Sequence, residues 1–142
     1  MPFSRTATFQ ARYDQVAVAC DFVADAAVAV GLGDKAAFQV QLACDEACTN
    51  IVEHAYRGQD GHFEVNCRLN GRQFIITIRD NGRTFDPQAI PTPFIPSSAS
   101  QAELLEVGGL GLHFMRKLMD EVRFNFTENG NELVMVKTMN NE

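Results

Sequence analysis

Two Asn-Gly pairs, each between two runs of alternating or continuous apolar residues, constrain the fold of this chain more than any other feature. They are Asn70-Gly71, between residues 62–69 and 72–79, and Asn129-Gly130, between residues 122–127 and 133–138. Such a pair is the strongest short-range signal for a β-hairpin, because both residues tolerate the positive φ angles of a two-residue turn. The sequence therefore predicts two antiparallel hairpins, and alternation over residues 3–11 indicates a further strand.

Three other segments have the composition and spacing of helices. They are residues 13 to about 30, followed by Gly31 and Gly33; residues 34 to about 56, with Asp34 as the expected cap and Gly58 at the end; and residues 112 to about 120. Glycine commonly follows a helix, because it accepts the left-handed conformation found there. Together with the hairpins, these helices predict an α+β fold, with a mostly antiparallel sheet and helices packed on one face.

Length and charge restrict the class of protein. The 142 residues fit one domain, expected over 1–142. The net charge of −6 would repel a phosphate backbone, so nucleic acid is not expected as a partner. A nucleotide remains possible, because a metal ion can neutralise its phosphates locally.

Several features predict a cytoplasmic protein. Residues 1–14 contain no apolar run flanked by basic residues, so we expect no signal peptide. The most apolar stretch, residues 22–32, is too short to span a bilayer, so no membrane segment is expected. The four cysteines contain no Cys-x-x-Cys pair, which favours buried thiols over disulfides in a chain without an export signal.

Residues 86–107 differ from the rest of the chain. They hold all but one of the five prolines, together with several serines, and they show no sustained periodicity. A loop of this length inside a domain is usually functional or disordered.

The first segment with chemical potential is the end of the second expected helix, residues 45–56. Helical spacing places Glu46 and Asn50 on one face, one turn apart, opposite an apolar face. A carboxylate beside an amide oxygen can provide a base and a hard metal ligand. Taken alone, a solvated helix face is the simpler interpretation.

The second segment is a strand that runs into Asp80, followed by Gly82. An aspartate at a strand end can accept a hydrogen bond from the amino group of a ligand, and glycine lets the backbone pass close to it. Asp-Asn-Gly is also favourable turn chemistry, so a plain turn explains this segment when it is considered alone.

The third segment is Gly-Gly-Leu-Gly-Leu, residues 108–112, which opens directly into a helix. Unpaired backbone N–H groups at a helix N-terminus attract an anion, and glycine allows phosphate oxygens to approach them. The chain has neither the P-loop pattern nor Gly-x-Gly-x-x-Gly.

In this order, the three segments resemble the N, G1 and G2 boxes of the GHKL ATPase/kinase superfamily, which has the Bergerat fold. The branch that the chain resembles is that of the anti-sigma-factor serine kinases of bacterial partner-switching systems. The stretches that carry this resemblance are residues 50–56, Asn-Ile-Val-Glu-His-Ala-Tyr; residues 80–87; and residues 118–122. Thr84 stands where the wider superfamily often has glycine, and we interpret this difference as a marker of the branch.

The resemblance implies a role for each matching residue. Asp80 would bind the adenine amino group of ATP, with Gly82 lining the base pocket. Asn50 would coordinate Mg²⁺ that bridges the phosphates, and Glu46 would be the general base that takes the proton of a protein serine. Residues 86–107 would form an ATP lid. The residues that would close over the phosphates are Gly108, Gly109, Leu110, Gly111 and Leu112.

The resemblance further implies an ATP-dependent serine protein kinase that also sequesters a sigma factor. Its phosphoacceptor would be a STAS-domain anti-anti-sigma protein, and it would act as a homodimer. The alternative is a nucleotide-gated regulatory module with little or no kinase activity. The two functions share the pocket and differ in whether Glu46 meets a hydroxyl group.

A histidine kinase fits less well, because the three histidines, His54, His62 and His113, include none that precedes the N box. His54 lies one turn beyond Asn50, where a role near the nucleotide and a role in capping the helix are both open. The sequence also leaves open which arginine, if any, contacts phosphate.

Overall fold

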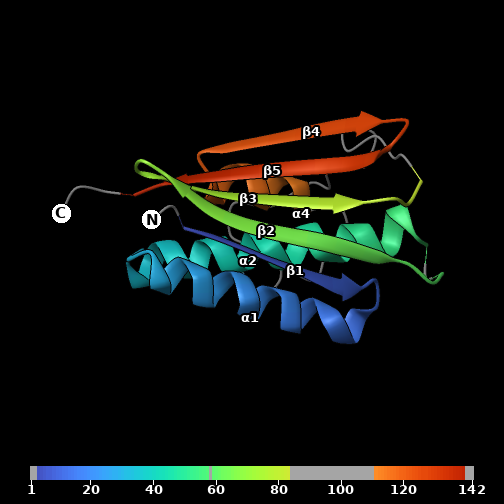
Figure 1. The fold of residues 1–142 in the computed structure, drawn as a ribbon, viewed down its shortest axis with the longest axis horizontal. Coiled ribbons are helices and arrows are strands. Elements are labelled where there is room, and N and C mark those ends of the chain that lie inside the picture. Colours follow the sequence, from blue (N-terminus) through green and yellow to red (C-terminus); the bar gives the residue numbers. More distant parts are fainter. Residues whose placement is uncertain (1–2, 58, 84–110, 140–142) are drawn as a thin grey trace, which may run out of the picture.

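The two predicted hairpins form the larger part of a five-stranded antiparallel sheet, which helices cover on one face (Figure 1). The computed structural model describes residues 3–57, 59–83 and 111–139. The strands are β1 (Ser4–Gln10), β2 (His62–Asn70), β3 (Gln73–Asp80), β4 (Glu121–Thr127) and β5 (Gly130–Thr138). The helices are α1 (Tyr13–Ala29), α2 (Asp34–Asn50) and α4 (Gly111–Leu118), with a π-helical turn, η1 (Ile51–Ala55), directly after α2.

The strand order in the sheet is β1-β2-β3-β5-β4, with every neighbouring pair antiparallel. This order confirms the predicted α+β fold with a mostly antiparallel sheet and helices on one face. It places β3 in the centre, so the end of β3 lies between β2 and β5. Asp80 is the last residue of that central strand.

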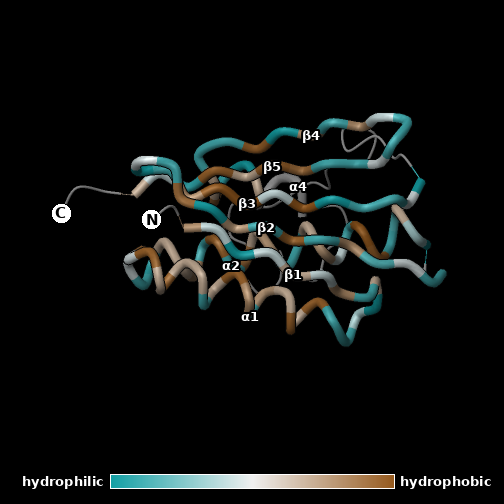
Figure 2. The backbone as a smooth tube through the Cα atoms, viewed as in Figure 1, coloured by the Kyte–Doolittle hydropathy of each residue, from teal (hydrophilic) through white to brown (hydrophobic). Residues whose placement is uncertain are grey.

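The core lies between the sheet and α1, α2 and α4. Alternate residues of the inner strands face the helices, as period-two alternation requires. They are Phe63, Val65 and Cys67 of β2, Phe74, Ile76 and Ile78 of β3, and Leu133 and Met135 of β5, all buried. The four cysteines are buried thiols, as predicted. In Figure 2 the hydrophobic stretches of β3 and β5 lie side by side in the middle of the sheet.

Both hairpins form, but the predicted turn positions were wrong by one residue. Asn70 pairs with Gln73, so the first turn is Gly71-Arg72, and Gly71 has the positive φ of 60° that its first position requires. Thr127 pairs with Gly130, so the second turn is residues 128–129. The register follows the apolar side chains that must face the helices, and the turns adjust to it.

Gly130 is required for close packing at the end of β3. Its φ is 139°, and a Cβ atom there would lie 2.8 Å from the carbonyl oxygen of Asp80 and from Oδ1 of Asn81. Of the second Asn-Gly pair, Asn129 therefore lies in the turn, whereas Gly130 allows a close backbone approach beside Asp80.

The predicted helix boundaries need three corrections. Gly33, with extended backbone, occupies the cap position of α2, and Asp34 is the first helical residue without a side-chain capping bond. The second helix is not regular up to Tyr56, because the N–H group of Tyr56 bonds to the carbonyl of Ile51, 3.1 Å away, in a π-helical turn. The left-handed residue after it is Arg57, with φ 54°, whereas Gly58 lies outside the described residues.

The third predicted helix begins and ends slightly earlier than expected, at Gly111 and Leu118. No helix among residues 3–57, 59–83 and 111–139 is long and apolar enough to cross a membrane.

Candidate active site

Asp80 ends β3 with its side chain on the helix-covered side of the sheet, and only 6% of it is exposed. Its Oδ1 atom accepts a hydrogen bond from the backbone N–H of Gly82, at 2.9 Å. The same oxygen accepts a second bond from Nδ2 of Asn131, also at 2.9 Å. The carboxylate is therefore held in one orientation from two sides.

Opposing effects act on the charge of Asp80. Burial raises the pKa of its carboxyl group, and the hydrogen bonds from Asn131 and Gly82 offset part of this increase because they favour the ionised form. Both bonds come from N–H donors, so the group they stabilise is a hydrogen-bond acceptor. An amino group of a ligand is a suitable donor to it.

Asn131 is a site residue that our sequence analysis missed. It is 4% exposed, and its Nδ2 atom lies within hydrogen-bond distance of Asp80 Oδ1 and of the backbone oxygens of Gly82 and Arg83, at 3.1 and 3.2 Å. It pairs with Asp80 across β3 and β5. The signal in the sequence was an asparagine directly after the glycine of the second hairpin, at a position where strand alternation places a core residue. Its partner, Asp80, depends on the strand order and not on the neighbouring residues.

Asn50 and Asp80 line the same small cavity between α2 and the sheet. Its volume is about 10 Å³, room for roughly one water molecule. The other lining residues include Ile51, Phe124, Phe126, Asn131 and Leu133. Asn50, predicted at the phosphates, and Asp80, predicted at the adenine, thus line one cavity. The rings of Phe124 and Phe126 line it as well. A nucleotide needs a pocket of the order of 300 Å³, which is larger than this cavity.

Glu46 lies one turn before Asn50 on α2, and both side chains are half-buried. Burial raises the pKa of the Glu46 carboxyl, and the neighbouring carboxylates of Asp45 and Glu53 raise it further. A raised pKa makes this carboxylate a stronger base. Glu46 is not among the residues that line the small cavity, so it stands at the margin of the site.

The hard amide oxygen of Asn50 suits Mg²⁺, which usually binds few protein ligands together with water and substrate phosphates. The described residues contain no group of three or more His, Cys, Asp or Glu side chains that could hold a metal ion by itself. The amide oxygen of Asn50 fits a metal that is held jointly with a nucleotide, because Mg²⁺ takes most of its other ligands from water and phosphates.

The glycine-rich segment is described only in part. Gly111 begins α4, which packs beside α2, and Leu112 follows it. Gly108, Gly109, Leu110 and the expected lid, residues 86–107, lie outside the described residues.

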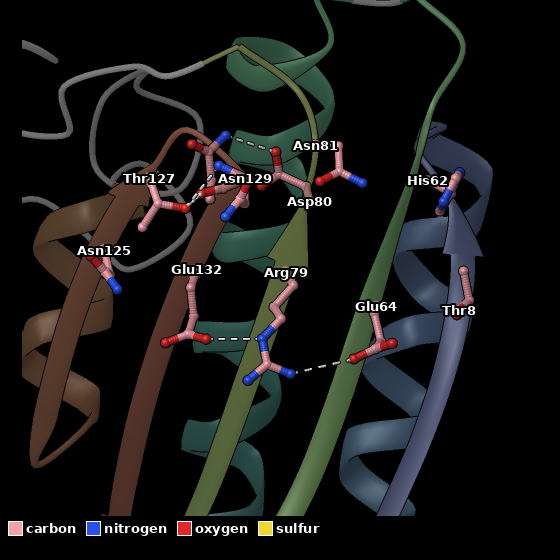
Figure 3. Close-up of a pocket in the computed structure, with 12 residues that line it drawn as sticks. Thr8, His62, Glu64, Arg79, Asp80, Asn81, Asn125, Thr127, Asn129 and Glu132 are labelled. Carbon is pink, nitrogen blue, oxygen red and sulfur yellow. Dashed lines mark hydrogen bonds and ion pairs between the residues drawn. The ribbon is translucent and has the colours of Figure 1, made fainter.

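A larger cavity, of about 430 Å³, lies on the uncovered face of the sheet (Figure 3). Its walls include Arg79, which forms ion pairs with Glu64 at 3.5 Å and with Glu132 at 2.9 Å. One arginine between two carboxylates leaves a net negative charge, which does not favour phosphate groups. Asp80 lines both cavities, whereas Asn50 lines the smaller one, so we place the nucleotide at the smaller cavity.

The arginines considered for phosphate contact are Arg79, Arg83 and Arg116, and the first two have other partners. Arg79 is engaged on the uncovered face, and Arg83 donates from Nε to the carbonyl oxygen of His54, at 2.9 Å. His54 thus receives a contact from the loop that follows Asp80. Arg116 lies exposed on α4.

Residues 9–137 match the model of the histidine kinase-like ATPase domain. The chain therefore belongs to the histidine kinase-like ATPase family.

Relatives within this family have a more specific name. The chain is 33% identical over 112 residues to the serine-protein kinase RsbW of Listeria innocua, covering 78% of this chain and 71% of the relative. It is 37% identical over 108 residues to the serine-protein kinase RsbW of Bacillus subtilis, covering 72% and 65%. The protein is accordingly a serine kinase of the GHKL type.

A solved structure supports the fold. The crystal structure of the RsbU and RsbW domains of a Mycobacterium tuberculosis protein superposes with a TM-score of 0.70 at 15% identity. The match covers 99% of this chain and 33% of that chain. This agreement confirms the Bergerat-type architecture expected from the three boxes.

Proposed function

We propose that this protein is an ATP-dependent serine protein kinase and anti-sigma factor of a bacterial partner-switching system. Its substrate would be a serine of a STAS-type anti-anti-sigma protein, and residues 1–142 would act as one kinase domain in the cytoplasm. The observation that carries the proposal is the meeting of Asn50 and Asp80 at one cavity in a chain similar to serine-protein kinases. ATP would supply the transferable γ-phosphoryl group.

Each site residue has a distinct task in this proposal. Asp80 accepts a hydrogen bond from the adenine amino group, with Gly82 beside the base. Asn50 would be a ligand of Mg²⁺, which would neutralise charge on the phosphates. The residues that close over the phosphates are Gly108, Gly109, Leu110, Gly111 and Leu112, with residues 86–107 as the lid. Binding and alignment of this kind provide most of the catalysis in phosphoryl transfer.

Glu46 would act on the protein substrate. It takes the hydroxyl proton of the acceptor serine while the serine oxygen forms a bond to the γ-phosphorus. The bond from that phosphorus to the β,γ-bridging oxygen breaks, and ADP leaves. The products are ADP, a phosphoserine on the partner and a protonated Glu46.

Sequestration of a sigma factor would require a surface but no base. We propose that the protein forms a homodimer, which would give one sigma factor a composite surface. Sedimentation at micromolar concentration measures this directly, and a monomer at every concentration tested would contradict the sequestering role while leaving ATP binding intact.

The direct experiment is incubation of the protein with labelled ATP and a STAS-domain protein encoded beside its gene. Label on a serine of that protein is the expected result. The position of Glu46 at the margin of the cavity keeps one alternative, a nucleotide-gated regulator with little transfer activity. ATP-dependent binding of the STAS partner without label would support that alternative.

The role of Asn50 predicts a specific dependence on magnesium. Mg²⁺ should increase the affinity for ATP, and Asn50→Ala should remove most of this increase, a loss of at least about tenfold. Calorimetry with and without Mg²⁺ measures both values. Asn125→Ala, on the uncovered face of the sheet, is the control. An equal effect of Mg²⁺ on the natural protein and on Asn50→Ala would exclude Asn50 as the ligand.

A further inference from the structure

Tyr56 stands at the junction between the helix that carries Asn50 and the turn that follows Asp80. Its hydroxyl donates a hydrogen bond to the carbonyl oxygen of His62, at 2.7 Å. The same hydroxyl accepts a bond from the backbone N–H of Asn81, at 3.0 Å. One side chain thus connects the start of β2 with the residue next to Asp80.

The ring of Tyr56 packs against Gly61. It lies so close to Gly61 that a Cβ atom there would be 2.3 Å from Cε1 and 2.5 Å from Cδ1 of the ring. Only glycine can be accommodated at this position without displacing the ring. The hydroxyl is therefore held in place by packing as well as by its two hydrogen bonds.

The turn after Asp80 is also packed against the end of the π-helical turn. The N–H of Arg83 donates to the carbonyl oxygen of Ala55, at 2.8 Å, while the Arg83 guanidinium donates to that of His54. A Cβ atom on Gly82 would lie 2.6 Å from the Ala55 oxygen. A cation at a helix C-terminus is also favourable for the helix dipole.

These contacts form a continuous series from Asn50, the proposed metal ligand, to Asp80, the proposed adenine-binding residue. Asn50 leads directly into η1, η1 leads to Tyr56, and Tyr56 holds Asn81 beside Asp80. Tyr56 itself does not line the cavity that Asn50 and Asp80 share. A residue in this position can act on the nucleotide only through the residues that it holds.

We propose that Tyr56 is a positioning residue that fixes the turn after β3, so that the Asp80 carboxylate meets the amino group of the purine. This inference rests on the proposed function, in which Asp80 binds adenine. It assigns Tyr56 to recognition of the base, whereas recognition of the metal and phosphates remains with Asn50 and the glycine-rich segment.

The test uses Tyr56→Phe, which removes both hydrogen bonds of the hydroxyl but keeps the ring on Gly61. Binding of ATP and of inosine triphosphate (ITP), which has a carbonyl in place of the amino group, is measured by calorimetry. We expect the ATP affinity to fall about three- to tenfold, the effect of one or two lost hydrogen bonds. The ITP affinity should change less, so the ATP-to-ITP ratio should fall.

Tyr13→Phe is the matched control, because Tyr13 is the other tyrosine of the chain. Its hydroxyl donates to the exposed Glu53, at 3.2 Å, and Tyr13 lines neither of the cavities that Asp80 lines. This variant should keep the natural ATP-to-ITP ratio. A general loss of stability would lower the affinities for both nucleotides by the same factor, so the ratio separates positioning from a merely structural role.

Hydrogen exchange provides a measurement that needs no variant. The Asn81 amide should exchange slowly in the natural protein and more slowly still with ATP bound. Rapid exchange of this amide would overturn the inference, as would an unchanged ATP-to-ITP ratio in Tyr56→Phe. If the natural protein binds ATP and ITP equally, the assignment of Asp80 to adenine fails first, and the role of Tyr56 in base recognition fails with it.

Discussion

Replacement of Glu46 by Gln is expected to slow phosphoryl transfer by about 10²- to 10⁴-fold, the usual contribution of a general base. Gln has nearly the size of Glu and can still form hydrogen bonds, but it cannot take the serine proton. ATP binding should remain about normal, because Glu46 does not line the cavity of Asn50 and Asp80. Binding of a sigma factor should also survive.

The pH dependence of transfer checks the same assignment. Burial and the carboxylates of Asp45 and Glu53 raise the pKa of Glu46. A base must be deprotonated to act, so transfer should decline as the pH falls through this raised pKa, at a higher pH than for an ordinary glutamate. Glu46→Gln should lack this decline.

Asp45→Asn is the matched control, since it alters the adjacent, exposed carboxylate. It should transfer phosphate at nearly the natural rate near neutral pH. Its acid decline should move to lower pH, because one of the charges that raise the Glu46 pKa is gone. Transfer to a STAS partner is followed with labelled ATP, beside a binding measurement on each variant. Transfer at the natural rate by Glu46→Gln would show that another group is the base.

Replacement of Asp80 by Asn is expected to lower the affinity for ATP about 10- to 100-fold, the range for losing a hydrogen bond to a charged group. Oδ1 of the new side chain can still accept the bonds from Gly82 and Asn131. Its amide nitrogen then occupies the place of the second carboxylate oxygen. That nitrogen is a donor and cannot accept a bond from the adenine amino group.

The same substitution should alter the choice between purines. The natural protein should bind GTP poorly, because guanine presents a carbonyl oxygen where adenine presents its amino group. The Asp80→Asn amide can donate to that carbonyl, so the ATP-to-GTP ratio should fall towards one or below. Calorimetry with both nucleotides measures this ratio, and Glu64→Gln on the uncovered face is the control. Equal affinity of the natural protein for ATP and GTP would contradict the role of Asp80.

Local sequence signals predicted the elements of the fold and part of the site. The spacing of apolar residues around Glu46 and Asn50 predicts a helix. A separation of four residues then places the two side chains one turn apart, which depends only on helix geometry. The hairpins were predictable for a similar reason, because their strands are joined by two residues. Even the aspartate at the end of a strand could be recognised from its neighbours in the chain.

Signals of this kind extend over a few residues, and two of the corrections concern effects of a longer range. The turns moved by one residue because the core determines which face each strand turns inward. The π-helical turn after Asn50 accommodates the turn after β3, which packs on its carbonyl groups. Neither effect is encoded in the residues of the turn or helix alone.

The sequence by itself thus determined the helices, the hairpins and the candidate residues Glu46, Asn50 and Asp80. Only the tertiary structure decided which partners hold them. Asn131 reaches Asp80 from 51 residues away, because the strand order places β5 beside β3. Tyr56 reaches Asn81 from 25 residues away, because the end of the helix lies over the end of the sheet. Such pairings depend on the packing of whole elements, which brings distant backbone segments within hydrogen-bond distance.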